Sequence, residues 1–304
     1  MTHFNTDDSF GHYPPAVIIM LTLVICLLGS MIGGGILFGW AAVNGITITD
    51  LVTGLDENAP LDRRNEVRCY TMLNHLTTFV LPALLTAAIL FRSRLWSWLR
   101  LHRSPTLRYM LVGAALMIAA FPLVQLSLWV NQQFPLPDWM TSMEEDTGAM
   151  IKGLLLMESP VELLFNLLII AVLPGIGEEL IFRGLIQQSL QKWLRSPHLA
   201  IWVTAAVFSA IHFQFEGFLP RMILGALLGY LFYWTHNLWI PIFAHFVTNG
   251  LQVVGAFFTK DLIGEIEGAE ATPNWIAVLL SVALVIFIIR YFQQQYAKTE
   301  QSVT

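Results

Sequence analysis

The chain has 304 residues, of which 56% are hydrophobic and only 12% are charged, against about 25% charged in an ordinary soluble domain. This composition excludes a soluble globule, and the net charge of -5 excludes a basic nucleic-acid-binding protein. Two cysteines are too few for a disulfide framework or a four-thiolate zinc site. We therefore expect one integral membrane domain over residues 1–304, surrounded by membrane lipid and without a nucleic-acid partner.

Eight apolar stretches are long enough, or nearly long enough, to cross a bilayer, which takes about 20 residues. They predict an all-α polytopic membrane helix bundle of about eight transmembrane helices. In chain order they are Ala16–Val43, Tyr70–Phe91, Tyr109–Val130, Pro160–Leu194, Leu199–Phe213, Leu219–Trp234, Leu238–Phe258 and Trp275–Phe292. The fourth stretch is expected to be broken at Pro174-Gly175. The fifth and sixth are short, so we expect neighbouring helices to shield them from lipid.

The loop charges indicate the orientation. With eight spans, nine Lys and Arg residues fall on the side of the termini and six on the other side, which favours both termini in the cytoplasm. The expected location is a bacterial inner membrane. The segment of about residues 92–108 alternates arginine with leucine and tryptophan, which predicts an interfacial helix on the anionic leaflet. The stretches 44–69 and 131–157 are interpreted as polar connections.

Ionisable side chains inside the spans are costly, so each is a candidate functional group. The fourth span contains Glu178, Glu179 and Arg183. Adjacent residues of a helix point about 100° apart, so the two carboxylates cannot share a face. Glu179 and Arg183 are spaced i and i+4 and predict a structural ion pair. This pairing leaves Glu178 over as a candidate general base.

Two further polar pairs lie on other spans. Phe208 and His212 share one face of the fifth span, and His245 and Asn249 share one face of the seventh. Alone, each pair is compatible with a structural hydrogen bond that holds helices together. Together with Glu178, they are what acyl hydrolysis in a membrane requires. A carboxylate and one imidazole take a proton from water, and the other imidazole and the amide stabilise the oxyanion.

At these residues the sequence resembles the CPBP family, the CAAX-protease and bacteriocin-processing group that is also called Abi. The family pattern is Glu-Glu-x-x-x-Arg, then Phe-x-x-x-His, then His-x-x-x-Asn, and all three motifs occur in order within a core of about residues 158–255. The resemblance implies an intramembrane glutamate endopeptidase of eight helices. It also implies that Glu178 and His212 activate water, that His245 and Asn249 form the oxyanion hole, and that Glu179, Arg183 and Phe208 support them.

By the same resemblance, the substrate is a prenylated or other membrane-associated peptide, and no cofactor is expected. Two alternatives stay open. Glu178, His212 and His245 are the ligand types of a zinc-dependent intramembrane protease, although the usual His-Glu-x-x-His motif is absent. Alternatively, the same acids and histidines form a polar seam in a non-enzymatic membrane scaffold or the proton relay of a transporter. A serine mechanism is disfavoured because no Gly-x-Ser-x-Gly occurs.

Overall fold

A computed structural model describes residues 13–47, 55, 59–259 and 272–301 of the protein, and within these ranges every regular element is helical. Seven helices are long and apolar enough to cross a membrane, and the helix at Pro197–Ala210 is apolar but shorter. The predicted all-α polytopic membrane fold is confirmed, and the protein is an integral membrane protein. Residues 1–12 and the acidic stretch 261–270 lie outside the described residues.

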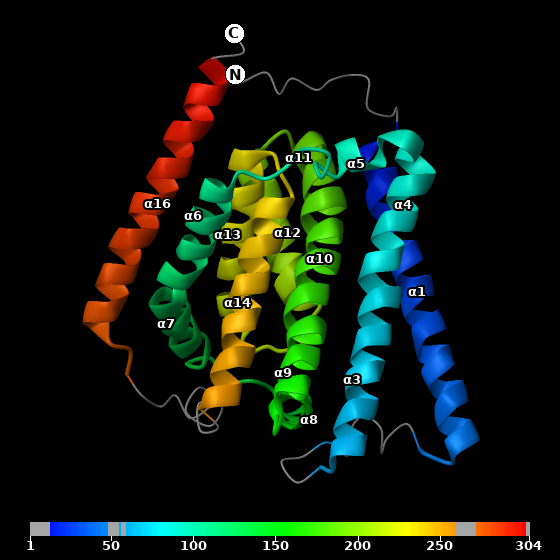
Figure 1. The fold of residues 1–304 in the computed structure, drawn as a ribbon. Coiled ribbons are helices and arrows are strands. Elements are labelled where there is room, and N and C mark those ends of the chain that lie inside the picture. The colour runs from blue at the N-terminus through cyan, green and yellow to red at the C-terminus, as the bar shows by residue number, and fades with distance from the viewer. Residues whose placement is uncertain (1–12, 48–54, 56–58, 260–271, 302–304) are drawn as a thin grey trace.

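The helices are labelled as in Figure 1. They are α1 (Pro15–Asn44), α3 (Leu61–His75), α4 (Leu81–Phe91), α5 (Leu95–Trp98), α6 (Leu107–Ala119), α7 (Phe121–Asn131), α8 (Asp138–Leu155), α9 (Pro160–Asn166), α10 (Leu173–Glu179), α11 (Gln188–Leu194), α12 (Pro197–Ala210), α13 (Phe218–Thr235), α14 (Trp239–Phe258) and α16 (Trp275–Gln301). Three π-helical segments, Leu76–Val80, Leu167–Val172 and Leu180–Gln187, join α3 to α4, α9 to α10 and α10 to α11.

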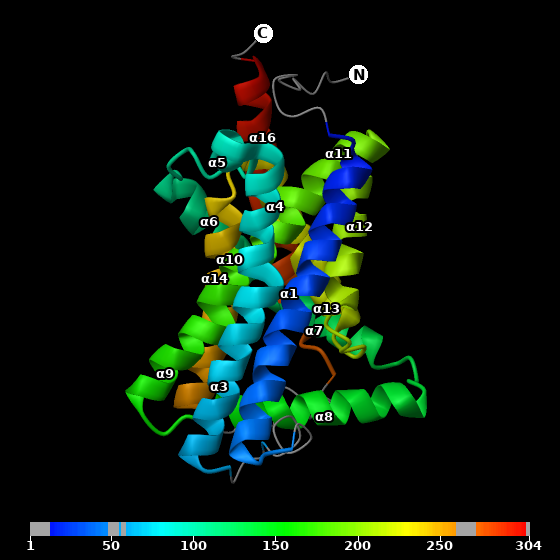
Figure 2. The same cartoon turned by 90° about the vertical axis from the view of Figure 1, so that its right-hand side faces the viewer.

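The bundle has a central group of helices and two flanks. Helices α10, α12, α13 and α14 stand in the centre, with α1, α3 and α4 on one flank and α6, α7 and α16 on the other (Figure 1). One apolar core includes Phe182 and Phe208, and a second includes Leu228 and Met117. The start of α1 and the end of α16 lie at the same end of the bundle, as an even number of crossings requires (Figures 1 and 2).

The fourth span is continuous, contrary to the expected break at Pro174-Gly175. From Pro160 to Leu194 the chain forms one helical rod of 35 residues. Pro174 has no N–H to donate, and the π-helical segment Leu167–Val172 directly before it changes the bonding pattern from i+4 to i+5. The π-bulge therefore lets the helix continue through the proline without a break. Such bulges recur at functional sites.

The predicted interfacial helix over 92–108 is wrong in extent. The structure has a single 3-10 turn at Arg92–Arg94 and the four-residue helix α5, and the chain from 99 to 106 is not helical. Arg92 and Arg100 have positive φ angles of 49° and 57°, which end helices on both sides. Trp98 and Leu99 are buried in the first apolar core. Part of the segment therefore packs into the end of the bundle.

A helix also forms in a region that the sequence analysis assigned to polar connections. Helix α8 lies across the end of the bundle opposite to α5, at a steep angle to the spans (Figure 2). Its residues Thr147, Met150 and Ile151 face the interior of the bundle, where they line a cavity. Similarly, α3 begins at Leu61, nine residues before the predicted start of its span at Tyr70.

Candidate active site

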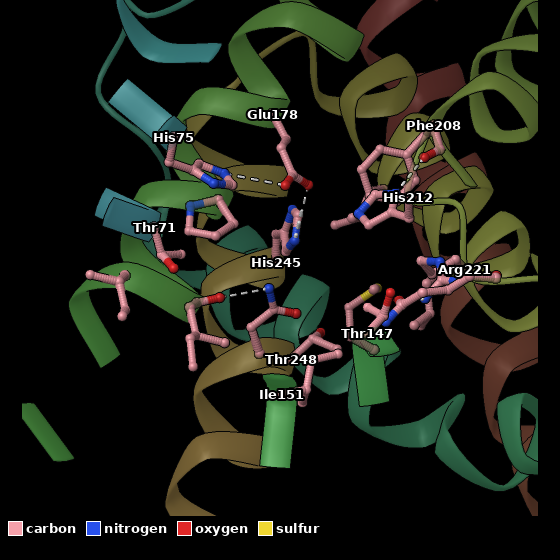
Figure 3. Close-up of a pocket in the computed structure, with 18 of the residues that line it drawn as sticks. Thr71, His75, Thr147, Ile151, Glu178, Phe208, His212, Arg221, His245 and Thr248 are labelled. Atoms are coloured by element: carbon pink, nitrogen blue, oxygen red, sulfur yellow. Dashed lines mark hydrogen bonds and ion pairs between the residues drawn. The ribbon is translucent and has the colours of Figure 1, made fainter. Parts of the chain in front are cut away.

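A cavity of about 360 Å³ lies inside the bundle and contains the predicted polar residues (Figure 3). Its walls come from α3, α6, α8, α10, α12, α13 and α14, so segments far apart in the chain meet there. Glu178, His212, His245 and Asn249 all line it. Both apolar cores contribute to its walls, through Phe208 on one side and Leu228 on the other.

Glu178 sits at the end of α10, directly before a π-helical segment, and is buried. Its Oε1 lies 3.3 Å from Nε2 of His75, and its Oε2 lies 3.9 Å from Nε2 of His245. The contact with His75 has ion-pair distance but lacks the alignment of a hydrogen bond. Glycine at position 177 permits the close packing of this helix beside Phe79, since a Cβ at Gly177 would lie 2.9 Å from the Cβ of Phe79.

The expectation that Glu178 has no partner is therefore wrong, because two imidazoles face it. Among the residues with described positions, imidazoles are also its only ion-pair partners within 4.0 Å. An imidazole changes its charge near neutral pH, whereas an arginine does not. Glu178 is thus a buried carboxylate whose neighbours can be neutral or charged, beside an open cavity.

Glu179 and Arg183 form the predicted i, i+4 ion pair, and both side chains are fully buried. The pair also has a second role that the spacing did not indicate. Oε1 of Glu179 accepts a hydrogen bond from Nδ1 of His245 at 2.9 Å. Because the carboxylate of an ion pair can only accept, Nδ1 carries the proton and Nε2 is the nitrogen that faces Glu178. Glu179 therefore contacts Nδ1 of His245, and the adjacent Glu178 faces its Nε2.

His212 follows the last turn of α12, and the backbone carbonyl of Phe208 sets its tautomer. Nδ1 of His212 lies 2.7 Å from that carbonyl oxygen. A carbonyl can only accept, so Nδ1 donates and Nε2 keeps its lone pair in the neutral ring. The Phe208 ring packs edge-on against His212 and His245, with centroids 5.0 and 6.2 Å away, and under the Arg183 guanidinium. Phe208 thereby fixes the spacing between the two imidazoles.

Asn249 lies one helical turn after His245 on α14, and its side-chain amide donates a hydrogen bond to the backbone. Its Nδ2 donates to the carbonyl oxygen of Ile170 at 3.0 Å. Ile170 lies within the π-helical segment Leu167–Val172. The bond from Asn249 thus ties α14 to this segment, and the second amide N–H of Asn249 is not used by this bond.

His75 and Arg221 also line the cavity, but they were not among the site residues predicted from the sequence. His75 was detectable, because it is an ionisable residue inside the apolar stretch Tyr70–Phe91, and this rule alone marks it as a candidate. Arg221 had no such signal, since it stands at the start of a short span beside the loop residues 211–217. Both residues require the three-dimensional fold to be placed near Glu178.

The zinc alternative finds no support in this geometry. Throughout the described part of the chain, no group of three or more His, Cys, Asp or Glu side chains is arranged to hold a metal ion. The four predicted residues do converge on one cavity, but their catalytic roles remain predictions.

Comparisons with known proteins support the resemblance within the motif-bearing segment. Residues 160–251 match the family described as type II CAAX prenyl endopeptidase Rce1-like. An uncharacterized protein of Bacillus subtilis (strain 168), YpbD, is 29% identical over 117 residues. That alignment covers 37% of this chain and 55% of the relative, so the chain spans about half the length of the curated relative it matches. No solved structure matches the chain. The segment that carries Glu178, His212, His245 and Asn249 is thus similar to the Rce1-like family, which supports the resemblance that the three motifs indicated.

Proposed function

We propose that this protein is an intramembrane endopeptidase that hydrolyses a peptide bond with water activated by Glu178 and His212. The observation that carries the proposal is the surroundings of Glu178, which is a buried carboxylate faced by imidazoles at the wall of a cavity. Acids that only hold a bundle together are matched by permanent cations, as Glu179 is by Arg183. The match of residues 160–251 to a family of prenyl endopeptidases supports the same reaction class.

In the proposed reaction, water in the cavity gives a proton to Glu178 while its oxygen attacks the carbonyl carbon of the peptide. Nε2 of His212 has a free lone pair that can accept a proton in this step, because its Nδ1–H donates to the carbonyl oxygen of Phe208. The proton then passes to the leaving amine, so the products are a carboxylate and an amine. No covalent enzyme intermediate forms, and no group outside this chain and the substrate is required.

The negative charge that develops on the substrate oxygen needs hydrogen-bond donors. Asn249 has an amide N–H left after its bond to Ile170. His245 donates its Nδ1–H to Glu179, so it offers Nε2–H to the oxyanion only when the ring carries both protons. Loss of one such donor typically lowers turnover about 10²–10³-fold.

The substrate class follows from where the site lies. Glu178 and His245 are on helices long and apolar enough to span the membrane, so the scissile bond must reach the interior of the bundle. A peptide with an attached lipid, or one that is otherwise membrane-associated, satisfies this requirement. The prenyl group in the description of the matching family supports a lipidated peptide as the first candidate.

The test is cleavage of a prenylated fluorescent peptide by purified protein in detergent. We expect Glu178→Gln to lower turnover by about 10²-fold or more, with an unchanged thermal unfolding midpoint. Glu66→Gln is the matched control, because Glu66 pairs with Arg63 on α3, outside the cavity. Full activity of Glu178→Gln would contradict the proposal and favour the scaffold or transporter reading. Chelators are expected to leave activity unchanged, and loss with EDTA that zinc restores would favour a metal mechanism.

A further inference from the structure

The cavity occupies one half of the bundle. Every residue with which the rod Pro160–Leu194 lines it lies at or before Glu178, which stands near the middle of that rod. From there the cavity extends toward α8, which lines it with Thr147 and Ile151. Figure 3 shows Glu178 and Ile151 at opposite ends of the cavity, with His245 between them. The reaction centre is thus connected to the end of the bundle where α8 lies.

The cavity wall is more accessible near α8 than at the reaction centre. Glu178 and His245 are buried. The lining residues of α8, Thr147 and Ile151, are half-buried, and so is Gln214 in the loop before α13. A wall whose exposure increases in this direction indicates that the cavity opens beside α8.

The other half of the bundle is filled with side chains. Beyond Glu179 the π-helical segment Leu180–Gln187 continues the rod toward α11, and all eight of its residues are buried. Leu99, next to α5, and Leu238, at the start of α14, belong to the same apolar core as this segment. Because protein interiors are close-packed, this core separates Glu178 from the α5 end of the bundle.

The two ends of the bundle also differ in their charges. At the α5 end, the sequence between residues 92 and 108 has five arginines and no acid. Arg92, Arg103 and Arg108 are exposed there. Exposed cations beside a membrane helix are attracted to the anionic leaflet of the cytoplasmic face, and loop cations mark that face in most membrane proteins.

The arginines of α3, near the α8 end, are held inside the protein. Arg64 and Arg68 are buried and pair with Glu162. Arg63 pairs with Glu66 one turn further along α3. Cations that are held in ion pairs are not available to an anionic leaflet, so they do not oppose the attraction at the other end. The charges therefore favour a cytoplasmic α5 end and an extracytoplasmic α8 end.

We propose that the site receives its substrate from the extracytoplasmic face of the membrane, beside α8. The proposal rests on the proposed peptidase function and adds the side of the membrane on which the peptide lies. The substrate class is an exported peptide that is lipidated or otherwise anchored in the membrane, and its scissile bond enters the outer half of the bilayer. A peptide on the cytoplasmic leaflet would have the packed core between its scissile bond and Glu178.

Cysteine accessibility tests the side of the membrane without an assay of cleavage. In a Cys26→Ala, Cys69→Ser background, one cysteine is introduced at the cavity by Thr71→Cys or Thr147→Cys, or at the α5 end by Ser104→Cys. A membrane-impermeant maleimide is added to spheroplasts or to inverted vesicles of the host. We expect the two cavity cysteines to react in spheroplasts and to lose labelling in inverted vesicles, with the opposite result for Ser104→Cys. The reverse pattern, or no reaction of either cavity cysteine in spheroplasts, would overturn the proposal.

Cleavage tests the same proposal with a substrate. A lipidated peptide with a charged, impermeant fluorophore is added to spheroplasts or to intact inverted vesicles that contain equal amounts of the protein. We expect cleavage by spheroplasts and loss of cleavage by inverted vesicles, which returns when detergent opens them. Glu178→Gln in the same preparations is the control for peptidases of the host. Cleavage by intact inverted vesicles at the rate of the opened ones would contradict entry from the extracytoplasmic face.

The two experiments separate this proposal from the proposed function. If the cysteines react as expected but the wild type cuts no peptide in detergent, the peptidase proposal fails and the side on which the cavity opens stands. If the protein cuts the peptide in detergent but the cavity cysteines react only in inverted vesicles, the peptidase function stands and the substrate enters from the cytoplasm.

Discussion

Two clusters of buried charges in this protein have similar residue types but different surroundings. The first is the centre around Glu178, Glu179 and His245 in the middle of the bundle. The second, here called the clamp network, ties α3 to the chain between α8 and α9. Its members are Arg64, Arg68, Glu158, Glu162 and Asn166. The two clusters differ in the partners of their acids, which is the basis for proposing a structural role for one and a reactive role for the other.

In the clamp network the acid groups are matched by arginines and backbone groups. Glu162 accepts from Arg64 at 3.1 Å and from Arg68 at 2.9 Å, and its other oxygen accepts from the Glu158 N–H. Arg68 also donates to the carbonyl oxygens of residues at the end of α8. Fixed charges and backbone acceptors thus hold α8 and α9 against α3. In the centre, by contrast, the ion-pair partners of Glu178 among the described residues are imidazoles, and a cavity lies beside it.

The largest effect is expected at Glu179, which forms a fixed ion pair with Arg183 and also orients His245. Glu179→Gln leaves Arg183 buried without a counter-charge, which we expect to destabilise the fold by about 3–5 kcal/mol. It also replaces the charged acceptor that orients His245 with a weaker amide oxygen, so turnover should fall as well. Thermal unfolding and peptide cleavage in detergent measure both effects. The double variant Glu179→Gln with Arg183→Gln should recover stability but not activity. A stable, inactive single variant would instead assign Glu179 directly to the chemistry.

Glu162→Gln tests the clamp network at its central acid. We expect a loss of about 3 kcal/mol, at the low end for a broken buried pair, because Glu158 remains as a partner of Arg64 and is itself exposed. The turnover of the protein that stays folded should be near that of the wild type. The measurement is the unfolding midpoint together with cleavage per folded molecule. A large loss of turnover without destabilisation would remove the distinction between the two clusters.

His75→Gln is expected to have the smallest effect on stability. The contact of His75 with Glu178 is 3.3 Å long and not aligned, and it does not cap a helix or hold a backbone group. We expect turnover to fall about tenfold, the effect of one charge-assisted contact, with the unfolding midpoint almost unchanged. The same cleavage assay measures it, and His198→Gln is the control, because His198 bonds to Tyr230 outside the cavity. Unchanged turnover would show that His75 only packs there.

The sequence predicted the helical fold and selected four polar residues that meet at one cavity, because polar groups in apolar spans are visible without coordinates. It did not predict how they are bonded. The i, i+4 rule indicated Glu179 with Arg183, but the bond from His245 to Glu179 joins residues 66 positions apart. Helix α8 was assigned to a polar connection because its stretch carries acids at 144–146. The arginine-rich turn after α4 was expected to lie on lipid, since no local pattern indicates that Trp98 and Leu99 enter the core.

The π-helical segment of the fourth span has a consequence for how this span and α14 are aligned. The carbonyl oxygen of Ile170, within that segment, accepts a hydrogen bond from Asn249 of α14. Sliding α14 by one turn, about 5.4 Å, would break this bond and leave the amide of Asn249 to find another partner, which is costly inside the bundle. A bond to the backbone of one rod thus sets the register of its neighbour. The same bond keeps His245, one turn before Asn249 on α14, level with Glu178.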